Sequence, residues 1–586
     1  MGSIPYSGGT TFRVWAPNAT KVYVAGDFNG WSQATSPLVS EGNGNWSVDF
    51  RNATINQQYK YVIWNGSSQL WKNDARAQQV TASNGNTVIA DPRFDWTDDL
   101  YSTPAWNDLV IYEMHVGTFN DTYGGLPGDF DNVILKLDYL QDLGINAIEV
   151  MPVNEFPGDF SWGYNMSHPF AIESVYGGSQ AYKRFVNAAH VRGIAILQDV
   201  VFNHYGPTDL DLWQYDGWHQ NFMGGIFFYN DERASTPWGD TRPDYGRSEV
   251  RQYIRDNSLF WLEDYHADGL RVDGTSWIRS VYGGGSYELP DGWSLMQWIN
   301  NEVDARQGWK FIVAEDMQNN AWMTKTTGAG GAGFDSQWSA QFVHPIRSNI
   351  ITSVDSNRNM WEVRDAISQR YNSDAFERII FTESHDEVAN GKMRVPEEIW
   401  PGNSGSWYSR KRSTLGAALV MTSPGVPMIF QGQEILENGY FADNDPIDWS
   451  KLNTYSGIHT LYSDLIKLRR NWYDNTRGLR GQNLNVHHVN DTDKVIAFHR
   501  WDTGGNGDDV IVILNMSNKT YPEYIIGFPS GGTWQVRFNS DSSIYSGDYG
   551  NYGSSSVNAV SGQWDGMPYN GALSIGPYSA MILSKD

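Results

Sequence analysis

The sequence predicts an α/β fold in which a (β/α)8 TIM barrel follows an N-terminal β-sandwich and precedes a C-terminal antiparallel β domain. Three observations predict it. In residues 1–98, polar and apolar residues alternate as in short strands. Over about the next 370 residues, strand patterns alternate with patterns of amphipathic helices. The pattern of short strands returns near residue 480. We therefore expect domains at 1–98, 99–478 and 479–586, with a short inserted loop domain at about 205–246.

The first domain shows the alternation of polar and apolar residues that is typical of half-buried strands. Its strand candidates are separated by turns rich in Gly, Asn and Pro, and Asn65-Gly66 is typical of a hairpin turn. The expected strands are 11–15, 21–25, 46–50 and 59–64. Short strands joined by tight turns indicate a small β-sandwich, and we expect residues 91–104 to form a linker.

In the middle region, short β-branched runs alternate with helical patterns. The clear strand candidates are 109–112, 147–150, 194–197, 270–272, 311–313, 379–381 and 428–430, with a weaker eighth near 333–335. The expected helices are 129–142, 180–192, 247–266, 293–304, 409–421 and 456–471. Eight parallel strands joined by helical crossovers close into a barrel, whose active site lies at the C-terminal ends of the strands.

The last region returns to alternating strands, which we expect at 494–498, 510–514 and 533–537. Residues 539–556 are rich in Ser, Gly, Tyr and Asp, so they are expected to form a loop. These strands indicate an all-β domain that follows the barrel.

The composition restricts the possible partners. The chain has 42 Lys and Arg against 67 Asp and Glu, a formal net charge of −25 at pH 7. This charge repels phosphate backbones and anionic lipid, so we expect neither nucleic acid nor a membrane as a partner. The absence of Cys excludes a disulfide scaffold, a thiol nucleophile and a thiolate metal site. No signal peptide is visible, so a cytoplasmic location is favoured, a secreted mature form stays open, and the oligomeric state is not predicted.

Tryptophan is unusually frequent, with 26 among 586 residues. Flat aromatic rings beside hydrogen-bonding side chains suit sugars, because a sugar ring has an apolar C–H face and polar edges. The alternative is that the rings fill a large core, which explains most single Trp residues. The composition therefore points to carbohydrate only when other signals agree.

Four of the expected barrel strands end in acidic residues, Asp199, Asp273, Glu315 and Asp386. A single acid after a strand is usually a helix N-cap or a turn residue. Four acids at the functional end of one barrel instead indicate catalysis, because glycoside cleavage needs one carboxylate at C1 and one protonated carboxyl at the leaving oxygen. Neighbouring strand ends allow the ~5–5.5 Å separation of a retaining pair.

These acids lie in four motifs: Asp-Val-Val-Phe-Asn-His at 199–204, Gly-Leu-Arg-Val-Asp at 269–273, Ala-Glu-Asp at 314–316 and Ser-His-Asp at 384–386. The motifs resemble, in order, the four signature regions of the α-amylase superfamily of glycoside hydrolases. Ser-Trp-Gly-Tyr-Asn at 161–165 is similar to the substrate-stacking segment of the same family. The resemblance covers the whole chain and implies a TIM-barrel enzyme whose partner is an α-glucan polysaccharide or oligosaccharide.

The resemblance also implies roles for individual residues. Asp273 would be the nucleophile, Glu315 the general acid and base, and Asp386 a third carboxylate that binds sugar hydroxyls. Arg271 lies two residues before Asp273, on the same face of the strand, and would keep the nucleophile ionised. Asp199 would in turn hold Arg271.

The remaining implied residues bind the substrate. His204 and His385 would hydrogen-bond hydroxyls of the cleaved sugar, and Tyr164 would form its stacking floor, within the segment that also contains Trp162. Alone, each His is more simply explained as a structural histidine.

Glu315 must hold a proton near neutral pH to act as an acid. Repulsion from an ionised Asp273 is expected to raise its pKa. Cleavage would then proceed by double displacement with retention, through a covalent glucosyl-Asp273 intermediate. The acceptor is a separate question, because either water or another sugar hydroxyl can complete the reaction.

Residues 12–90 resemble the glycogen- and starch-binding module attached to many enzymes of this superfamily. The resemblance rests on Val-Trp-Ala-Pro-Asn at 14–18 and Gly-Asp-Phe-Asn-Gly-Trp at 26–31. The residues implied for glucan binding are Trp31, Lys60, Trp71 and Asn86. The alternative, that the module only packs on the barrel and no longer binds sugar, stays open.

The motifs divide between hydrolysis and branching. Segments 110–119 and 151–159 resemble both glycogen-branching enzymes and maltooligosyltrehalose trehalohydrolases. Segment 384–392 is nearer the branching pattern, whereas Phe-Gln-Gly-Gln-Glu at 430–434 is closer to hydrolases. We favour an amylase-type hydrolase of α-1,4-glucans, with a branching enzyme that transfers the chain to a 6-hydroxyl as the alternative. A trehalose-releasing hydrolase and a catalytically silent glucan-binding protein are less favoured.

The chemistry that the resemblance implies requires no cofactor. The family's structural calcium site would use Asn203, but Gly274, Thr275 and Ser276 stand where amylases often carry basic residues and His. Calcium needs several converging oxygen ligands, so the sequence argues against a calcium site. No metalloprotease, phosphate-loop or dinucleotide motif competes for the active site.

Overall fold

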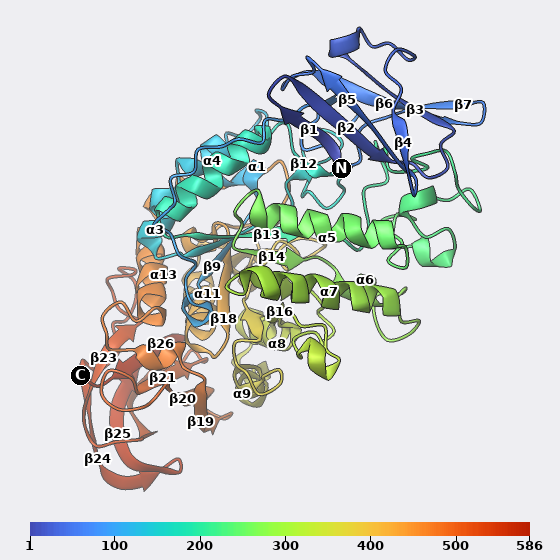
Figure 1. Cartoon of the computed structure of the whole chain (residues 1–586). Coiled ribbons are helices and arrows are strands. Elements are labelled where there is room, and N and C mark those ends of the chain that lie inside the picture. The colour runs from blue at the N-terminus through green and yellow to red at the C-terminus, as the bar shows by residue number, and fades with distance from the viewer.

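The computed structural model describes all 586 residues and places two β domains on opposite sides of a central barrel (Figure 1). The N-terminal domain has two antiparallel sheets, which confirms the predicted β-sandwich. One sheet has the order β1 (Gly2–Tyr6), β2 (Gly9–Trp15), β5 (Asn45–Arg51) and β4 (Val39–Gly42), and the other contains β3 (Lys21–Gly26), β6 (Gln58–Asn65), β7 (Ser68–Lys72) and β8 (Thr87–Val88). Phe12 and Tyr59, one from each sheet, meet edge to face in the core, with ring centroids 4.8 Å apart.

The barrel is closed and parallel, as predicted, with β18 paired to β9. Its strands are β9 (Ile111–Met114), β10 (Ala147–Val150), β13 (Ala195–Val200), β14 (Gly269–Val272), β15 (Phe311–Ala314), β16 (Ser336–Trp338), β17 (Arg378–Ile380) and β18 (Val426–Phe430). The expected eighth strand at 333–335 is wrong by three residues. Gly333 has a φ of +83°, which belongs to a turn rather than a strand, and β16 begins only at Ser336.

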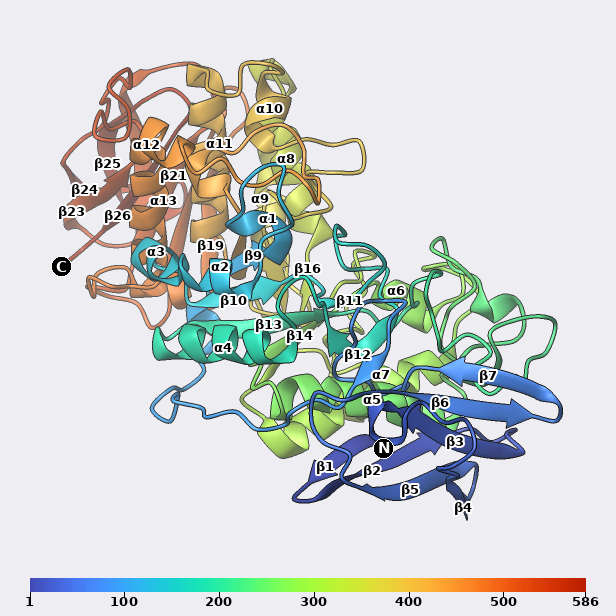
Figure 2. The same ribbon diagram turned by 90° about the horizontal axis from the view of Figure 1, so that it is seen from above.

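Helices surround the barrel (Figure 2). They are α1 (Val116–Phe119), α2 (Phe130–Ile134), α3 (Leu137–Leu143), α4 (Gly178–Val191), α5 (Ser248–Glu263), α6 (Thr275–Arg279), α7 (Pro290–Gln307), α8 (Ala340–Ile351), α9 (Met360–Ser368), α10 (Val395–Ile399), α11 (Trp407–Thr422), α12 (Lys451–Thr454) and α13 (Ser456–Arg469). The single helix expected at 129–142 is two helices, because the backbone leaves the helical region at Lys136. None of the helices has the length and the apolarity that crossing a lipid bilayer requires.

The linker between the first domain and the barrel is held on the side of α4. The Lys183 ammonium donates to the Pro92 carbonyl at 2.9 Å, and the Asn187 side-chain oxygen accepts from the Thr97 amide at 2.7 Å. Residues 92–98 contain neither helix nor strand. The linker is thus irregular, but hydrogen bonds to α4 fix its path.

Two segments of the barrel extend beyond the helix and strand repeat. A hairpin of β11 (Asn154–Glu155) and β12 (His168–Ile172) follows β10. Residues 201–247 contain no α-helix or full strand, only two short 3-10 helices, Gly225–Phe227 and Glu232–Ala234, and isolated β-bridges. The second segment touches the N-terminal domain, since Asp216 accepts from the Asn18 amide at 2.8 Å.

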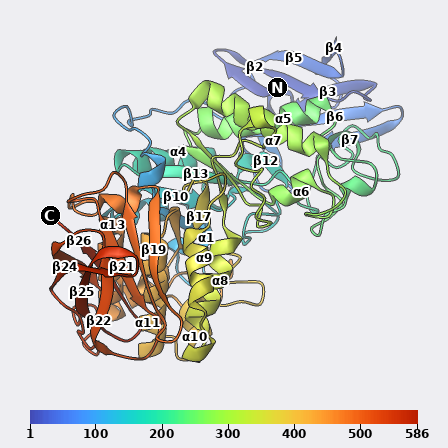
Figure 3. The same ribbon diagram turned by 90° about the horizontal axis from the view of Figure 1, so that it is seen from below.

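The C-terminal domain is an eight-stranded antiparallel sheet next to α11 and α13 (Figure 3). Its strands are β19 (Asn483–Asn490), β20 (Val495–Trp501), β21 (Val510–Asn515), β22 (Tyr521–Phe528), β23 (Gly532–Asn539), β24 (Ser556–Trp564), β25 (Met567–Ile575) and β26 (Ser579–Ser584). The segment between β23 and β24 is the predicted loop. A fully buried ion pair, 2.6 Å between Lys411 and Asp541, fastens this loop to α11.

Candidate active site

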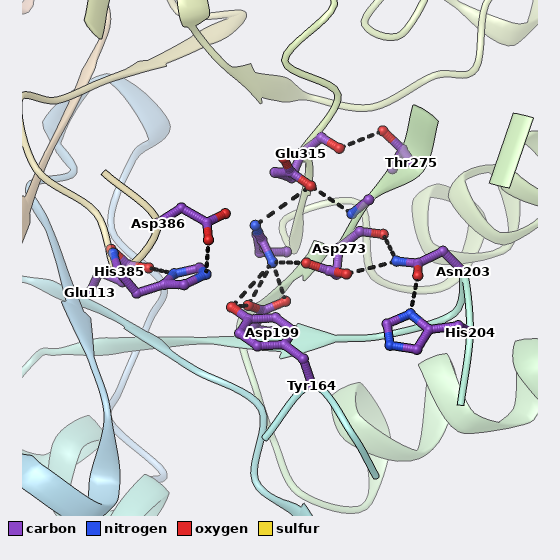
Figure 4. Close-up of polar contacts among 12 residues, drawn as sticks. Glu113, Tyr164, Asp199, Asn203, His204, Asp273, Thr275, Glu315, His385 and Asp386 are labelled. Atoms are coloured by element: carbon purple, nitrogen blue, oxygen red, sulfur yellow. Dashed lines mark hydrogen bonds and ion pairs between the residues drawn. The ribbon is translucent and has the colours of Figure 1, made fainter. Parts of the chain in front are cut away.

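A cleft of about 820 Å³ lies at the C-terminal ends of the barrel strands. Asp273 directly follows β14, Glu315 directly follows β15, and Asp386 lies in the loop after β17; all three line the cleft. Figure 4 shows Asp273 and Glu315 close together, with Asp386 facing them. The fourth predicted acid, Asp199, lies within β13 and is only 2% exposed.

Arg271 is the centre of the acidic group. Its guanidinium is completely buried and lies 2.7 Å from Asp199, 2.8 Å from Asp273 and 3.8 Å from Glu315. Arg271 and Asp273 are two residues apart at the end of β14, so both side chains point to the same side. One buried cation therefore faces three carboxyl groups and compensates part of their charge.

The second oxygen of Asp273 is bound as well. The Asn203 amide nitrogen donates to Asp273 Oδ2 at 2.7 Å, while Arg271 binds Oδ1. The Asn203 amide oxygen contacts the His204 ring. Gly274 has a φ of +50°, and a Cβ there would lie 2.5 Å from the Asn203 side chain, so glycine permits this contact. The two donors, one at each oxygen, hold the Asp273 side chain in one orientation.

Glu315 lies close to two other carboxyl groups, Asp273 and Asp386. Burial raises the pKa of Glu315 to about 8, and repulsion from Asp273 and Asp386 adds to this, although Arg271 and the Gly274 amide oppose it. The Gly274 N–H donates to Glu315 Oε2 at 2.7 Å. The pKa is raised in the expected direction, but burial contributes more than the repulsion that we invoked from the sequence. Glu315 therefore holds its proton at pH 7, beside the Asp273 side chain.

His385 joins Asp386 to the barrel. The two carboxylates beside it, Asp386 at 3.6 Å and Glu113 at 2.5 Å, raise the pKa of His385 to about 9 against the effect of burial. The imidazole therefore carries a positive charge at pH 7. Its Nδ1 donates to Glu113, and its Nε2 forms an ion pair with Asp386. Glu113, which lies in β9, also accepts from the His385 backbone amide at 3.1 Å.

The predicted stacking residues form the wall near His385. The Tyr164 ring is stacked on the His385 ring at 5.0 Å, and its hydroxyl donates to Asp199 at 2.6 Å. Trp162 meets the same His385 ring edge to face at 6.0 Å. The structure therefore brings these aromatic side chains and the acids to one cleft.

His204 lies on the other side of Asp273. Burial lowers the pKa of His204 to about 4, so its ring is neutral at pH 7. Burial also raises the pKa of Asp199 to about 7, although Arg271 opposes the shift. At pH 7 His204 is therefore neutral and Asp199 is only partly ionised, so neither adds a full charge next to Arg271 and Asp273.

More than half of the chain matches one known protein family. The model of the alpha amylase catalytic domain matches residues 113–216 and 210–461. The chain belongs to the α-amylase family. Its C-terminal all-beta domain matches at residues 486–586, and carbohydrate-binding module 48, the isoamylase N-terminal domain, matches at 1–77. The chain is therefore an enzyme of the α-glucan-active glycoside hydrolases and transglycosylases.

Individual proteins that are similar to this α-amylase family member are glucan-active enzymes as well. The 1,4-alpha-glucan branching enzyme GlgB of Corynebacterium diphtheriae is 28% identical over 98% of this chain and 80% of its own length. The enzyme of the same name from Dechloromonas aromatica is 29% identical over 99% of this chain and 95% of its own length. The structure of a pullulanase from Anoxybacillus sp. LM18-11, complexed with maltotetraose, superposes with a TM-score of 0.76 at 20% identity, covering 100% of this chain and 87% of the pullulanase. At this low identity, the similarity to the pullulanase shows only that the two proteins have the same fold.

The active site of this α-amylase family member also contains residues that were not selected from the sequence. Glu113 is one: it is buried behind the cleft, where it binds His385, and an acid inside the apolar strand Ile-Tyr-Glu-Met was a usable signal. Trp238 is another: its ring is 44% exposed, lines the cleft and stacks on His204 at 4.5 Å. Asn390 and Lys392, at the end of the segment 384–392, line the cleft as well.

The residues expected to bind glucan in the N-terminal module lie near each other. The rings of Trp31 and Trp71 are stacked with centroids 6.4 Å apart. Lys60 is on the same face of the sheet as Trp71, because its β6 neighbour Val62 pairs with Trp71. Asn86 donates to Gln58 of β6 at 2.9 Å. Trp31 has a φ of +60°, a strained conformation of the kind that clusters at ligand sites.

Proposed function

We propose that this chain is a retaining 1,4-α-glucan branching enzyme, in which Asp273 is the nucleophile and Glu315 the general acid and base. The observation that carries the proposal is the match of GlgB branching enzymes over nearly the whole chain, together with the acid pair in the cleft. Amylase-type hydrolysis, which the sequence alone favoured, has the same first step but less support from the relatives.

In the first half-reaction, a glucan chain lies in the cleft with C1 of one glucose unit above Asp273. A carboxylate oxygen of Asp273 forms a bond to C1 while the C1–O4 bond breaks, and the Glu315 proton moves to O4. Arg271 and Asn203 hold the nucleophile in place, since each donates to one of its oxygens. Asp386 would bind sugar hydroxyls on the opposite side.

In the second half-reaction, the 6-hydroxyl of another glucan chain replaces the departed chain. Glu315, now ionised, takes the proton of that hydroxyl, O6 forms a bond to C1, and the bond to Asp273 breaks. Two displacements at C1 retain the α configuration. The product is an α-1,6 branch, whereas water in the same place would give hydrolysis.

The shape of the cleft supports a reaction with two chains. A second cavity of about 460 Å³ adjoins the main cleft. Both cavities are lined by Trp162, Asn390, Lys392 and Asp443, so one can continue into the other. A branching enzyme must hold several units of the donor chain while it admits an acceptor, which requires more room than one glucose unit occupies.

The acceptor is tested by incubating the enzyme with amylose. We expect new α-1,6 branches, which a debranching enzyme releases as short chains, and few new reducing ends. Branch formation is measured from the released chains, and hydrolysis from the reducing ends before debranching. New reducing ends without released chains would instead identify an amylase-type hydrolase.

Activity should decrease in alkaline solution because Glu315 must be protonated to act as the acid. With its pKa raised to about 8, the group holds its proton below that pH and loses it above. We expect kcat/KM on a maltooligosaccharide to fall about tenfold per pH unit above this value. A profile that stays flat to pH 10, in an enzyme that circular dichroism shows to be folded, would contradict this assignment.

The N-terminal module is proposed to bind glucan through its two stacked Trp rings. Replacing both Trp31 and Trp71 by Ala should lower retention of the enzyme in a glycogen-containing gel by about tenfold, because both ring platforms are lost. Trp564→Ala, which removes a 45% exposed ring from the C-terminal domain, is the matched control. Unchanged retention of the double variant would favour the alternative in which the module only packs on the barrel.

A further inference from the structure

A cavity of about 640 Å³ lies outside the active cleft, between α9 and the edge strand β19 of the C-terminal sheet. Figures 1 and 3 show α9 beside β19, at the junction of the barrel and the C-terminal domain. No residue of this cavity belongs to the active cleft or to the N-terminal module. Its volume is in the range of small-molecule sites.

One wall of the cavity is an exposed aromatic ring. Trp361, in the first turn of α9, is 48% exposed and lines the cavity. The Arg364 guanidinium lies over this ring, 4.8 Å from its centroid, and its other contacts are to Asp365. Arg364 thereby restrains the indole. A large ring that is half exposed in a cavity is suited to stack on the C–H face of a sugar.

The opposite wall is a β-bulge. Val486 pairs with Phe498 and His488 pairs with Ala497, so His487 is an extra residue in β19. A bulge redirects the side chain of the extra residue, and His487 lines the cavity. Because β19 is an edge strand that pairs only with β20, the bulge interrupts the hydrogen bonds to one neighbouring strand and not to two.

His487 has an unused hydrogen-bonding atom. Its Nδ1 lies 3.3 Å from the Asn485 carbonyl, which can only accept, so Nδ1 carries the hydrogen and Nε2 is an acceptor. Nε2 is buried and has no partner. Burial lowers the pKa of His487 to about 4, so the ring stays neutral at pH 7. A hydroxyl donor would satisfy Nε2 after a turn of the ring toward the cavity.

The remaining charged groups of the cavity are already compensated. Asp565 accepts from His488 at 3.0 Å, and Asp491 pairs with Lys494 at 3.0 Å. Arg364 is the one cation on the wall, and it faces Asp365. The cavity therefore lacks the clustered cations that would bind a phosphate or another strong anion. It fits a neutral ligand with hydroxyl groups.

We propose that this cavity is a second glucan-binding site, in which Trp361 stacks on a glucose unit of a neutral α-glucan and His487 accepts a hydroxyl hydrogen bond. The choice of α-glucan as the ligand rests on the proposed function. The site holds one part of a long chain while another part of the same polymer is in the active cleft, which raises the local concentration of substrate.

The test is affinity electrophoresis in gels that contain amylose, with Trp31 and Trp71 already replaced by Ala so that the module contributes nothing. In this background, Trp361→Ala should weaken retention at least about fivefold, and Trp361→Phe, which keeps a ring, should restore most of it. Trp472→Ala is the matched control, because that ring is 46% exposed and lies elsewhere on the surface. Retention of Trp361→Ala equal to that of its parent would overturn the proposal.

Kinetics separate this site from the active cleft. In the same background, Trp361→Ala should lower the ratio of kcat/KM on amylose to kcat/KM on maltoheptaose by about fivefold, because only the long chain reaches both sites. An unchanged ratio would overturn the second site even where branches form normally. If amylose gives new reducing ends without branches, the branching proposal fails. The gel retention and the ratio of kcat/KM values still show whether the second site exists.

Discussion

Asp273→Asn should lower kcat on amylose by at least about 10⁴-fold while leaving the fold and glucan affinity close to those of the wild type. The neutral amide is a poor nucleophile, so no covalent glucosyl intermediate forms. Its size matches that of the carboxylate, and its oxygen can still accept from Arg271, which lies 2.8 Å from Asp273. The loss therefore concerns the chemical step and not the shape of the cleft.

The measurement combines turnover with binding. Initial rates on amylose give kcat, and calorimetric titration with maltoheptaose gives the dissociation constant, which should change less than about threefold. Asp142→Asn, on the exposed side of α3, is a control of the same chemical change and should leave both values unaltered. If the Asp273 variant kept more than a trace of the wild-type rate, another group would have to be the nucleophile.

Glu315→Gln should produce a loss that depends on the leaving group. Gln is neutral, as protonated Glu315 is, and its amide oxygen can accept from the Gly274 N–H that now donates at 2.7 Å. It has no acidic proton, so cleavage of amylose should slow by about 10³–10⁴-fold. A glycosyl fluoride needs little protonation of its leaving group, so the first half-reaction on it should persist.

This difference is visible as a burst of fluoride. The Glu315 variant should release about one fluoride per enzyme quickly and then stall, because the second half-reaction lacks its base. Mass spectrometry of the stalled enzyme should find a glucosyl group on Asp273. Equal losses on amylose and on the fluoride, with no burst, would contradict the role of Glu315 as acid and base.

Much of the fold followed from sequence patterns, and the exceptions have physical causes. Seven barrel strands were recognisable because they are short, mainly apolar runs. Strand β16 is Ser-Gln-Trp, and it was predicted three residues too early. Five of the eight C-terminal strands, β19, β22, β24, β25 and β26, were not predicted, and β24 for example contains Ser, Asn and Gly. Such strands form because neighbours pair with them, and pairing is not a local property.

The candidate site divides in the same way. The acids at the strand ends were selected from their motifs, but Glu113 was not, because its partner His385 is 272 positions away along the chain. Trp238 was missed for a similar reason, since a long irregular segment brings it onto His204. Contacts of this kind exist only after the barrel has closed.

The sequence by itself determined the order of the domains, the barrel and the residue types that carry the chemistry, because these depend on periodicity and on motifs along the chain. The resemblance already implied that Glu315 holds the proton, but only the tertiary structure decided what raises its pKa. Asp273 and Glu315 both lie next to the Arg271 guanidinium. Burial is the main cause that raises the pKa of Glu315 to about 8, whereas Asp273 has a charged donor at one oxygen and a neutral donor at the other. Protonation depends on distance and desolvation in space, and neither quantity is written in the order of the residues.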